Sequence, residues 1–275
     1  MCAITEQTTC GVVGLEHLYE RGLLPVPAIN INDCFIKKHF DNFHGVQESL
    51  VRGLMTATGM QLAGKLVSIF GYGPVGKGAA MVLRSLGCRV AIVERDLLKA
   101  VQAHFDGFEI FNPADAVRSA HICITATGCE NTVSAELIDQ AADGLILCNI
   151  GHGSAEYDVA YLRARASPQA VNPFLDAHQI GQDRTVYSLC QGALTNLVAG
   201  RGNPPAIMSL TFTLQILAQR EFLRNRQNYA EPRVHRLARS VEVECATLNH
   251  PEFLDRLYTL SPRQSDFLRS YDADC

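Results

Sequence analysis

The sequence predicts an α/β fold built on a doubly wound parallel sheet, and three observations support this prediction. Continuous apolar runs, typical of strands buried on both faces, recur along the chain. Helical segments alternate with these runs, and the glycine-rich turn GYGPVGKG joins one run directly to a helix. The chain has 275 residues, 47% of them hydrophobic and 19% charged, which is typical of a globular protein with a substantial core.

The expected elements follow one another along the chain. The first 34 residues hold a short apolar piece, a helix-like segment near 14–21 and the extended stretch PVPAININD, in which two prolines oppose a helix. An apolar face predicts a helix over about 46–63. Strands are expected at 66–70, 88–94, 108–111, 121–127 and 145–150, with helices from the glycine turn to about 86 and over 135–142. Two long helices are expected at 208–226 and 234–248, before a polar tail.

Charge and cysteine content exclude several classes of protein. The formal net charge is −4 and no Lys/Arg-rich block occurs, so neither nucleic acid nor a membrane surface is expected as a partner. The sequence shows no secretory signal and no run of roughly 18–20 apolar residues, so a cytoplasmic location is expected. The ten cysteines include no CxxC pair, which favours reduced thiols over disulfides or a metal site. A small molecule is therefore the expected ligand.

The glycine-rich turn predicts a dinucleotide site. Gly71, Gly73 and Gly76 have the spacing GxGxxG between a predicted strand and a predicted helix. The first glycine permits the tight turn, the second lets the backbone approach a pyrophosphate, and the third allows close packing of helix and strand. Glu94 ends the next predicted strand, where a carboxylate binds the ribose hydroxyls of NAD and repels the 2′-phosphate of NADP. The site is expected to prefer NAD, although the cations just after Glu94 leave NADP as an alternative.

Several stretches resemble S-adenosylhomocysteine hydrolases and occur in the order found in that family: PAININDCFIKKHFDN, GYGPVGKG with Glu94, TATGC, CNIGH and, less closely, QGALTNL. The resemblance implies that most of the family's N-terminal substrate domain is absent. It also implies that NAD is used catalytically. The ribose 3′-hydroxyl is oxidised, a base removes the acidified C4′ hydrogen, the group on C5′ leaves, water adds, and the hydride is returned.

The resemblance divides the chain into three parts. Residues 1–46 correspond to a remnant of the substrate domain, 47–202 to an NAD-binding Rossmann domain, and 203–275 to a helical C-terminal region. By analogy with members of the family, an oligomer is expected.

The resemblance also implies roles for individual residues. The catalytic candidates are Lys37, Asp41, Asn42 and Asn32. The cofactor-binding candidates are Thr8, Thr9, Asn42, Gly71, Gly73, Pro74, Val75, Gly76, Glu94, Lys99, Thr127, Asn149, Ile150, Gly151, His152 and Asn196. The substrate-binding candidates are Gln7, Lys37, Asp41, His152, Asn203 and Met208. Without the resemblance, Lys37 and Asp41 are also compatible with an exposed i,i+4 ion pair. The threonine and asparagine candidates are likewise compatible with ordinary helix caps or turns.

The chain departs from the family pattern at several positions. Gln7 stands where the family has a glutamate for the substrate ribose, and Val46 replaces a cysteine near the nicotinamide. Gly153 replaces a bulky aromatic residue, and Asn203 replaces a histidine that helps hold adenine. The resemblance further implies that the Lys/Tyr tail that reaches a neighbouring subunit, and the His and Asp that handle the 5′ leaving group, are expected to have no counterpart.

Together these features favour an NAD-dependent hydrolase or lyase of nucleoside or one-carbon metabolism. The expected reaction is 3′-oxidation-assisted elimination or hydration on a nucleoside with a small C5′ substituent, for example loss of a hydroxyl as water. One alternative is the NAD-binding subunit of a two-chain adenosylhomocysteinase, completed by a separate substrate-domain polypeptide. The sequence is also compatible with a non-catalytic NAD-binding regulatory protein and with a plain 3′-dehydrogenase.

Overall fold

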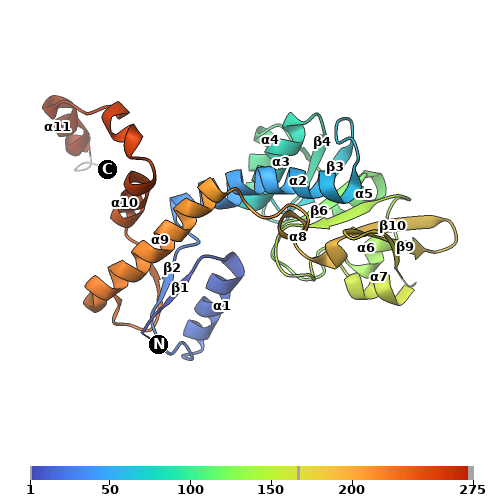
Figure 1. Cartoon of the computed structure of the whole chain (residues 1–275), viewed down its shortest axis with the longest axis horizontal. Helices are drawn as coiled ribbons and strands as arrows, with labels where there is room; N and C mark the ends of the chain where they lie inside the picture. Colours follow the sequence, from blue (N-terminus) through green and yellow to red (C-terminus); the bar gives the residue numbers. More distant parts are fainter. Residues whose placement is uncertain (1, 166–167, 272–275) are drawn as a thin grey trace.

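The computed structural model describes residues 2–165 and 168–271. Its larger sheet has the strand order β5-β4-β3-β6-β7-β10-β9-β8 (Figure 1). The strands from β5 to β10 run parallel, and β9 and β8 extend the sheet in antiparallel fashion. Their bounds are β3 Leu66–Phe70, β4 Arg89–Val93, β5 Glu109–Ile110, β6 Ile122–Thr125, β7 Ile146–Asn149, β8 Gln169–Asn172, β9 Leu175–Ile180 and β10 Arg184–Leu189. The predicted doubly wound parallel sheet is confirmed.

Helices cover both faces of this sheet. Successive strand residues point to opposite faces, so Val67 and Ile69 pack beneath one group of helices while Leu66 and Phe70 pack beneath the other. The first group is α2 Val46–Thr58 and α3 Pro74–Ser85, and the second is α5 Pro113–Ser119, α6 Ala135–Ile138 and α7 Val159–Arg165. Helix α4 Leu97–Phe105 contributes Ala103 to the core of the first group, and the short helix α8 Thr195–Val198 packs against α2.

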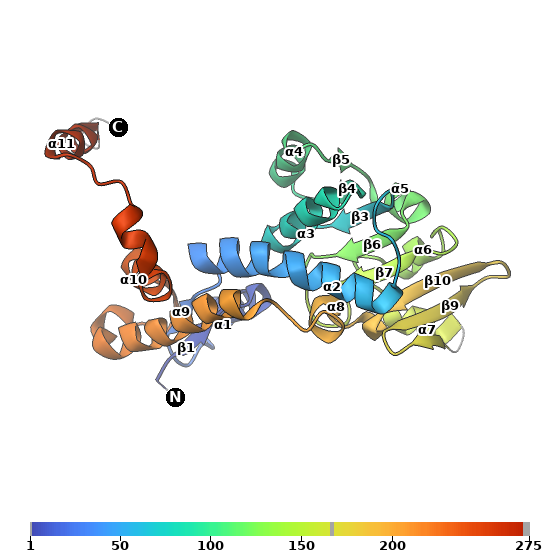
Figure 2. The same ribbon diagram turned by 45° about the horizontal axis from the view of Figure 1, so that its top comes forward.

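The two ends of the chain share a second, smaller core. A parallel sheet of order β1-β2-β11 joins strands Ile4–Glu6, Ala28–Asn30 and Val234–Arg236. Residues from β2 and from the following helix η1 pack with the long helix α9 and with α10. Figure 2 shows α9 and α10 from a second side. The helices of this part are α1 Thr9–Glu20, η1 Ile36–Gly45, α9 Pro205–Arg224, η3 Arg226–Tyr229, α10 Arg239–Asn249, η4 Pro251–Arg256 and α11 Pro262–Tyr271.

Two local predictions were wrong, the helix at 234–236 and the end of the helix over 46–63, and two further features were not predicted. The segment 234–236 is not helical but forms strand β11, because it pairs with β2. The antiparallel strands β8 to β10 were not anticipated. The helix over 46–63 ends at Thr58, where Gly59 takes a left-handed conformation that glycine adopts readily. The segment before α2, whose helix type the sequence left open, is a ten-residue π-helix, η1.

The described cysteines, from Cys2 to Cys245, are all free, and Cys275 lies outside the described residues. Among the described residues, no helix combines the length and apolar character needed to cross a membrane.

The shared terminal core makes a first prediction. Leu214 on α9 is fully buried in it, whereas Gln219 on the same helix is exposed. We expect Leu214→Ala to lower the free energy of unfolding by about 2–5 kcal/mol, because the change leaves a cavity. Gln219→Ala serves as the control and should stay within about 0.5 kcal/mol of the parent. Denaturant unfolding measures both, and equal effects would contradict a shared core.

Candidate functional site

A buried lysine and aspartate form the centre of the site. Lys37 and Asp41 are only 7% and 5% exposed, and Lys37 Nζ lies 2.5 Å from Asp41 Oδ2. Lys37 Nζ also donates to Asn42 Oδ1 at 2.9 Å. Both partners are within reach because η1 is a π-helix, whose backbone hydrogen bonds join residues five apart, so positions i+4 and i+5 both approach position i. The pair is therefore a buried ion pair rather than an exposed one.

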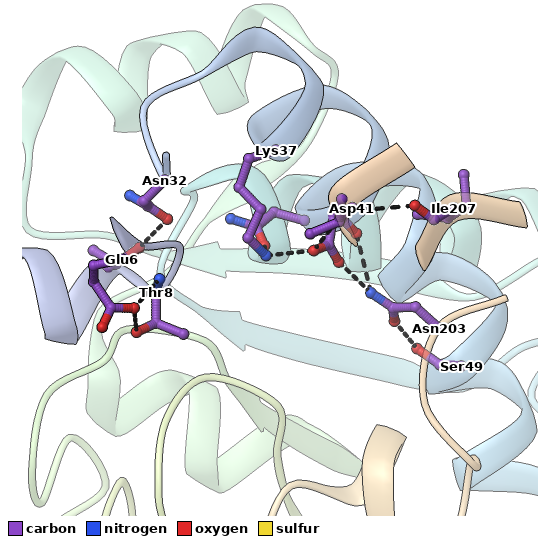
Figure 3. A network of polar contacts seen from close by, with 11 residues as sticks. Glu6, Thr8, Asn32, Lys37, Asp41, Ser49, Asn203 and Ile207 are labelled. Atoms are coloured by element: carbon purple, nitrogen blue, oxygen red, sulfur yellow. Dashed lines mark hydrogen bonds and ion pairs between the residues drawn. The ribbon is translucent and has the colours of Figure 1, made fainter. Parts of the chain in front are cut away.

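Asp41 is held by donors from distant parts of the chain. Asn203 Nδ2 donates to Asp41 Oδ1 at 2.5 Å, and Thr211 Oγ1 on α9 donates to Oδ2 at 3.2 Å. Ser49 Oγ on α2 in turn donates to Asn203 Oδ1 at 2.9 Å. Figure 3 shows Lys37 pointing toward this group. The carboxylate thus has partners on both oxygens.

The N-terminal loop lies on the other side of Lys37 (Figure 3). Asn32 is 6% exposed and accepts a hydrogen bond from Thr9 Oγ1 at 3.2 Å. The backbone N–H and the hydroxyl of Thr8 both donate to Glu6 Oε1, at 2.7 and 2.5 Å. Glu6 thereby fixes the turn that leads from β1 into α1, and it was not among the predicted residues.

The glycine turn follows β3 at the carboxyl edge of the parallel strands. Gly71 has φ +96°, which favours glycine. A Cβ on Gly76 would lie 1.9 Å from Gly71 O, so this position closes the turn. A Cβ on Gly78 would lie 2.4 Å from Phe43 O, so the absence of a side chain lets α3 approach η1. The glycines thus bring the turn and the Lys37 helix close together.

Glu94 is fixed in place at the end of β4. Its Oε2 accepts the backbone N–H of Tyr72 at 2.7 Å, and its Oε1 accepts those of Arg95 and Asp96 at 2.8 and 3.0 Å. The carboxylate therefore bridges β4 and the glycine turn, at the place where a dinucleotide ribose binds in folds of this class.

Glu156 is a buried carboxylate that sequence reasoning missed. It is 2% exposed and binds the loop after β6: Thr127 N and Oγ1 both donate to Oε2 at 3.0 Å, and Gly128 N donates to Oε1 at 2.7 Å. A Cβ on Gly151 would lie 2.0 Å from Glu156 Oε1, so the loop after β7 leaves room for this carboxylate. A single glutamate in a polar loop gives no sequence signal of burial.

The first turn of α1 lies beside this loop. A Cβ on Gly128 would lie 3.4 Å from Cys10 Sγ. Burial, and then the negative charge of Glu156, raise the pKa of the Cys10 thiol, so the thiol is neutral near pH 7. A raised pKa does not favour the thiolate that a nucleophilic cysteine needs. No group of three or more possible metal-ligating side chains occurs among the described residues.

Three features of the protein itself fit a bound dinucleotide. A Cβ on Gly73 would meet no atom within 4 Å, and its φ of −75° suits any residue, so neither packing nor backbone conformation requires glycine there. The N-terminus of α3 next to it has no side-chain cap, which leaves backbone N–H groups for an anion. Asn196 Oδ1 is buried without a hydrogen-bond partner among the described residues.

The remaining predicted residues surround this edge of the sheet. Asn149 uses its side chain internally, since it accepts from Gly151 N at 2.9 Å and donates to Gly192 O at 2.9 Å. Gln7 follows β1, and its Oε1 is buried without a partner among the described residues. Pro74 and Val75 begin α3, Ile150 and His152 follow β7, Lys99 lies on α4, and Met208 lies on α9. His152 and Lys99 are exposed.

The model of the S-adenosyl-L-homocysteine hydrolase NAD-binding domain matches residues 42–202. Among curated proteins, the adenosylhomocysteinase of Nostoc sp. is 37% identical over 268 residues, which cover 97% of this chain and 63% of that protein. This chain therefore spans less than two thirds of that relative's length. The match to the NAD-binding domain identifies NAD as the cofactor.

Solved structures with a similar fold include dipicolinate synthases. The dipicolinate synthase chain from Bacillus subtilis has a TM-score of 0.50 at 14% identity, covering 79% of this chain and 65% of that one. The corresponding protein from Bacillus halodurans has a TM-score of 0.49 at 15% identity, covering 73% of this chain and 62% of that one. At such identities the likeness concerns the fold alone.

The contrast between two glycines makes a second prediction. Gly73→Ala should leave the unfolding temperature unchanged but weaken NAD binding by about tenfold or more, because the new methyl group enters the space open to the cofactor. Gly76→Ala should instead destabilise the apo protein by about 1–3 kcal/mol, because the methyl group collides with the backbone. Calorimetric titration with NAD and thermal unfolding separate the two effects. Wild-type affinity in Gly73→Ala would contradict this placement of the cofactor.

Glu156 makes a third prediction. Glu156→Gln keeps the shape but turns an amide N–H₂ toward backbone donors, so we expect the 126–129 loop to loosen. The measurement is hydrogen exchange at the amides of Thr127 and Gly128, which should become about tenfold faster. Glu130→Gln, at an exposed position, is the control. Unchanged protection in Glu156→Gln would show that the carboxylate does not hold the loop.

Proposed function

The chain belongs to the S-adenosyl-L-homocysteine hydrolase family, and from this membership we propose that it is an NAD-dependent enzyme acting on the ribose of a nucleoside. The proposed reaction oxidises the 3′-hydroxyl, removes the C4′ proton, and eliminates or adds a small group at C5′, for example a hydroxyl lost as water. When bound, NAD accepts a hydride from C3′ and returns it at the end of the cycle.

The observation that carries this proposal is the buried Lys37–Asp41 pair beside the glycine turn. An ammonium has three N–H donors, and Lys37 donates two hydrogen bonds, one to Asp41 and one to Asn42. The third donor remains for a sugar hydroxyl. Because the pair is shielded from water, Lys37 is suited to hold and transfer a proton at the ribose 3′-oxygen.

Asn32 and Gln7 complete the proposed sugar site. Asn32 faces Lys37 from the end of β2, and its Nδ2 is left to donate to a hydroxyl. Gln7 presents a buried amide oxygen that lacks a protein partner among the described residues. A neutral amide accepts a hydroxyl more weakly than a carboxylate does, so we propose that the substrate is held mainly through Lys37 and its neighbours.

A homo-oligomer is part of the proposal. Several large apolar side chains of α9 and α10 are exposed on one chain, among them Phe212, Leu223, Val243 and Leu248. Exposed apolar side chains in this number are typical of a protein interface. Alternatively, a separate substrate-domain polypeptide covers these side chains. Co-purification distinguishes such a partner from a second copy of this chain.

The fourth prediction tests the reaction. The NAD-loaded protein is incubated with adenosine, guanosine, cytidine and uridine in deuterium oxide, and deuterium at C4′ is measured by mass spectrometry. We expect exchange with at least one nucleoside, together with transient absorbance of reduced nicotinamide. Lys37→Met should lower the exchange rate by about 10²–10⁴, because the proton-transfer group is removed.

The neighbouring lysine provides the control. Lys38 forms an ion pair with Asp33 at 2.7 Å on the partly exposed side of η1, so Lys38→Met should exchange at close to the wild-type rate. Bound NAD without exchange or reduction in any nucleoside would favour the non-catalytic regulatory alternative. Stoichiometric consumption of NAD would identify a plain 3′-dehydrogenase.

A further inference from the structure

The side-chain amide of Asn203 is fully engaged inside the protein. A carboxylate only accepts and a hydroxyl can donate, so the amide nitrogen must face Asp41 and the amide oxygen must face Ser49. Asn203 Nδ2 reaches Asp41 Oδ1 at 2.5 Å and the backbone oxygen of Asp41 at 3.3 Å. Its two N–H groups are therefore both directed to Asp41. Little hydrogen-bonding capacity remains for a ligand.

Gly45 provides the space that this contact needs. A Cβ on Gly45 would lie 2.6 Å from Asn203 Nδ2 and 2.8 Å from its Cγ. Gly45 has ordinary helical angles, φ −62° and ψ −37°, so its backbone does not require glycine. The absence of a side chain at position 45 thus serves the approach of Asn203 to Asp41.

Two neighbouring amides of the site behave differently. The buried oxygens of Asn196 and Gln7 have no hydrogen-bond partner among the described residues, as expected of groups that await a ligand. Asn203 lies close to the same site and has the same chemistry as Asn196, yet its amide is satisfied. The site therefore contains amides with an unpartnered oxygen, Asn196 and Gln7, and one amide whose groups are satisfied by the protein, Asn203.

We propose that Asn203 is a positioning residue for Asp41 and does not read the base of the substrate. Of the described residues, it supplies the donor to Asp41 Oδ1, while Lys37 and Thr211 occupy Oδ2. Without it, Oδ1 is a buried, charged acceptor with no partner, and the carboxylate turns to recover one. Rotation of the Asp41 carboxylate displaces the oxygen that orients Lys37. This inference rests on the proposed function, in which Lys37 transfers a proton at the ribose.

The consequence concerns the class of substrate. If Asn203 serves the reaction at the ribose, then this residue does not discriminate between nucleosides that differ only in their base. We therefore expect Asn203 to support the reaction at the ribose 3′-hydroxyl equally for every base.

The fifth prediction compares Asn203→Ala and Gly45→Ala in the NAD-loaded protein. The measured quantities are kcat and KM of C4′ exchange for each nucleoside that the wild type accepts. Both variants should lower kcat by about tenfold or more, by the same factor for every base, with KM within about twofold of wild type. Gly45→Ala acts without altering the chemistry of Asn203, because its methyl group displaces the amide. A rise in KM that differs between bases, with kcat retained, would overturn the proposal.

Two further measurements do not depend on turnover. In thermal unfolding, Asn203→Ala and Asp41→Asn should lower the unfolding temperature by less together than the sum of their separate effects, because they share one contact. In titration with NAD, Asn196→Ala should weaken binding while Asn203→Ala leaves it within about twofold. Additive unfolding shifts, or a loss of NAD affinity in Asn203→Ala, would refute the positioning role. If the wild type exchanges no nucleoside while these results hold, the proposed reaction fails and the contact stands.

Discussion

Burying the Lys37 ammonium and the Asp41 carboxylate removes both charges from water, which is tolerable only when each is matched by nearby partners. The structure meets this requirement with groups from three parts of the chain: Asn42 in the same π-helix, Asn203 before α9 and Thr211 within it. The N-terminal and C-terminal segments must therefore fold together before the pair is satisfied. Their common core is accordingly a condition for the site and not only a source of stability.

The glycine turn places this pair next to the cofactor edge of the larger sheet. Gly78 allows α3 to approach the backbone of η1, while Gly71 and Gly76 close the turn itself. The same helix therefore presents its N-terminus to a phosphate and its side to the Lys37 helix. In this way one short stretch of sequence sets the distance between the redox group and the proton-transfer group, which is the geometric requirement of the proposed chemistry.

Much of this arrangement was predictable because its signals are local. Continuous apolar runs marked β3, β6 and β7, and the glycine spacing marked the turn. Backbone conformation requires glycine at Gly71, and a close backbone contact requires it at Gly76. Strand β11 and the burial of Glu156 were not predictable, because each depends on partners far away in sequence. The π-helix η1 was not predicted either, because the spacing of Lys37 and Asp41 does not distinguish it from an α-helix. Spacing alone did not decide whether the Lys37–Asp41 ion pair is exposed or buried, because its burial results from the packing of α2, α3 and α9 around η1.

Asparagines show this limit most clearly, because identical side chains at the same edge of the sheet have opposite roles. Asn149 and Asn203 use their amides to tie loops and side chains together, whereas Asn196 leaves a buried oxygen without a partner among the described residues. A buried polar atom without a partner is costly, so it persists only where something else satisfies it. At this edge of the sheet we therefore interpret the unpartnered oxygens of Gln7 and Asn196 as open to a ligand, whereas the amide of Asn203 is satisfied by the protein. In the proposed function, position 203 therefore holds Asp41, and Gln7, Asn196 and the open space at Gly73 are the features left for the ligand.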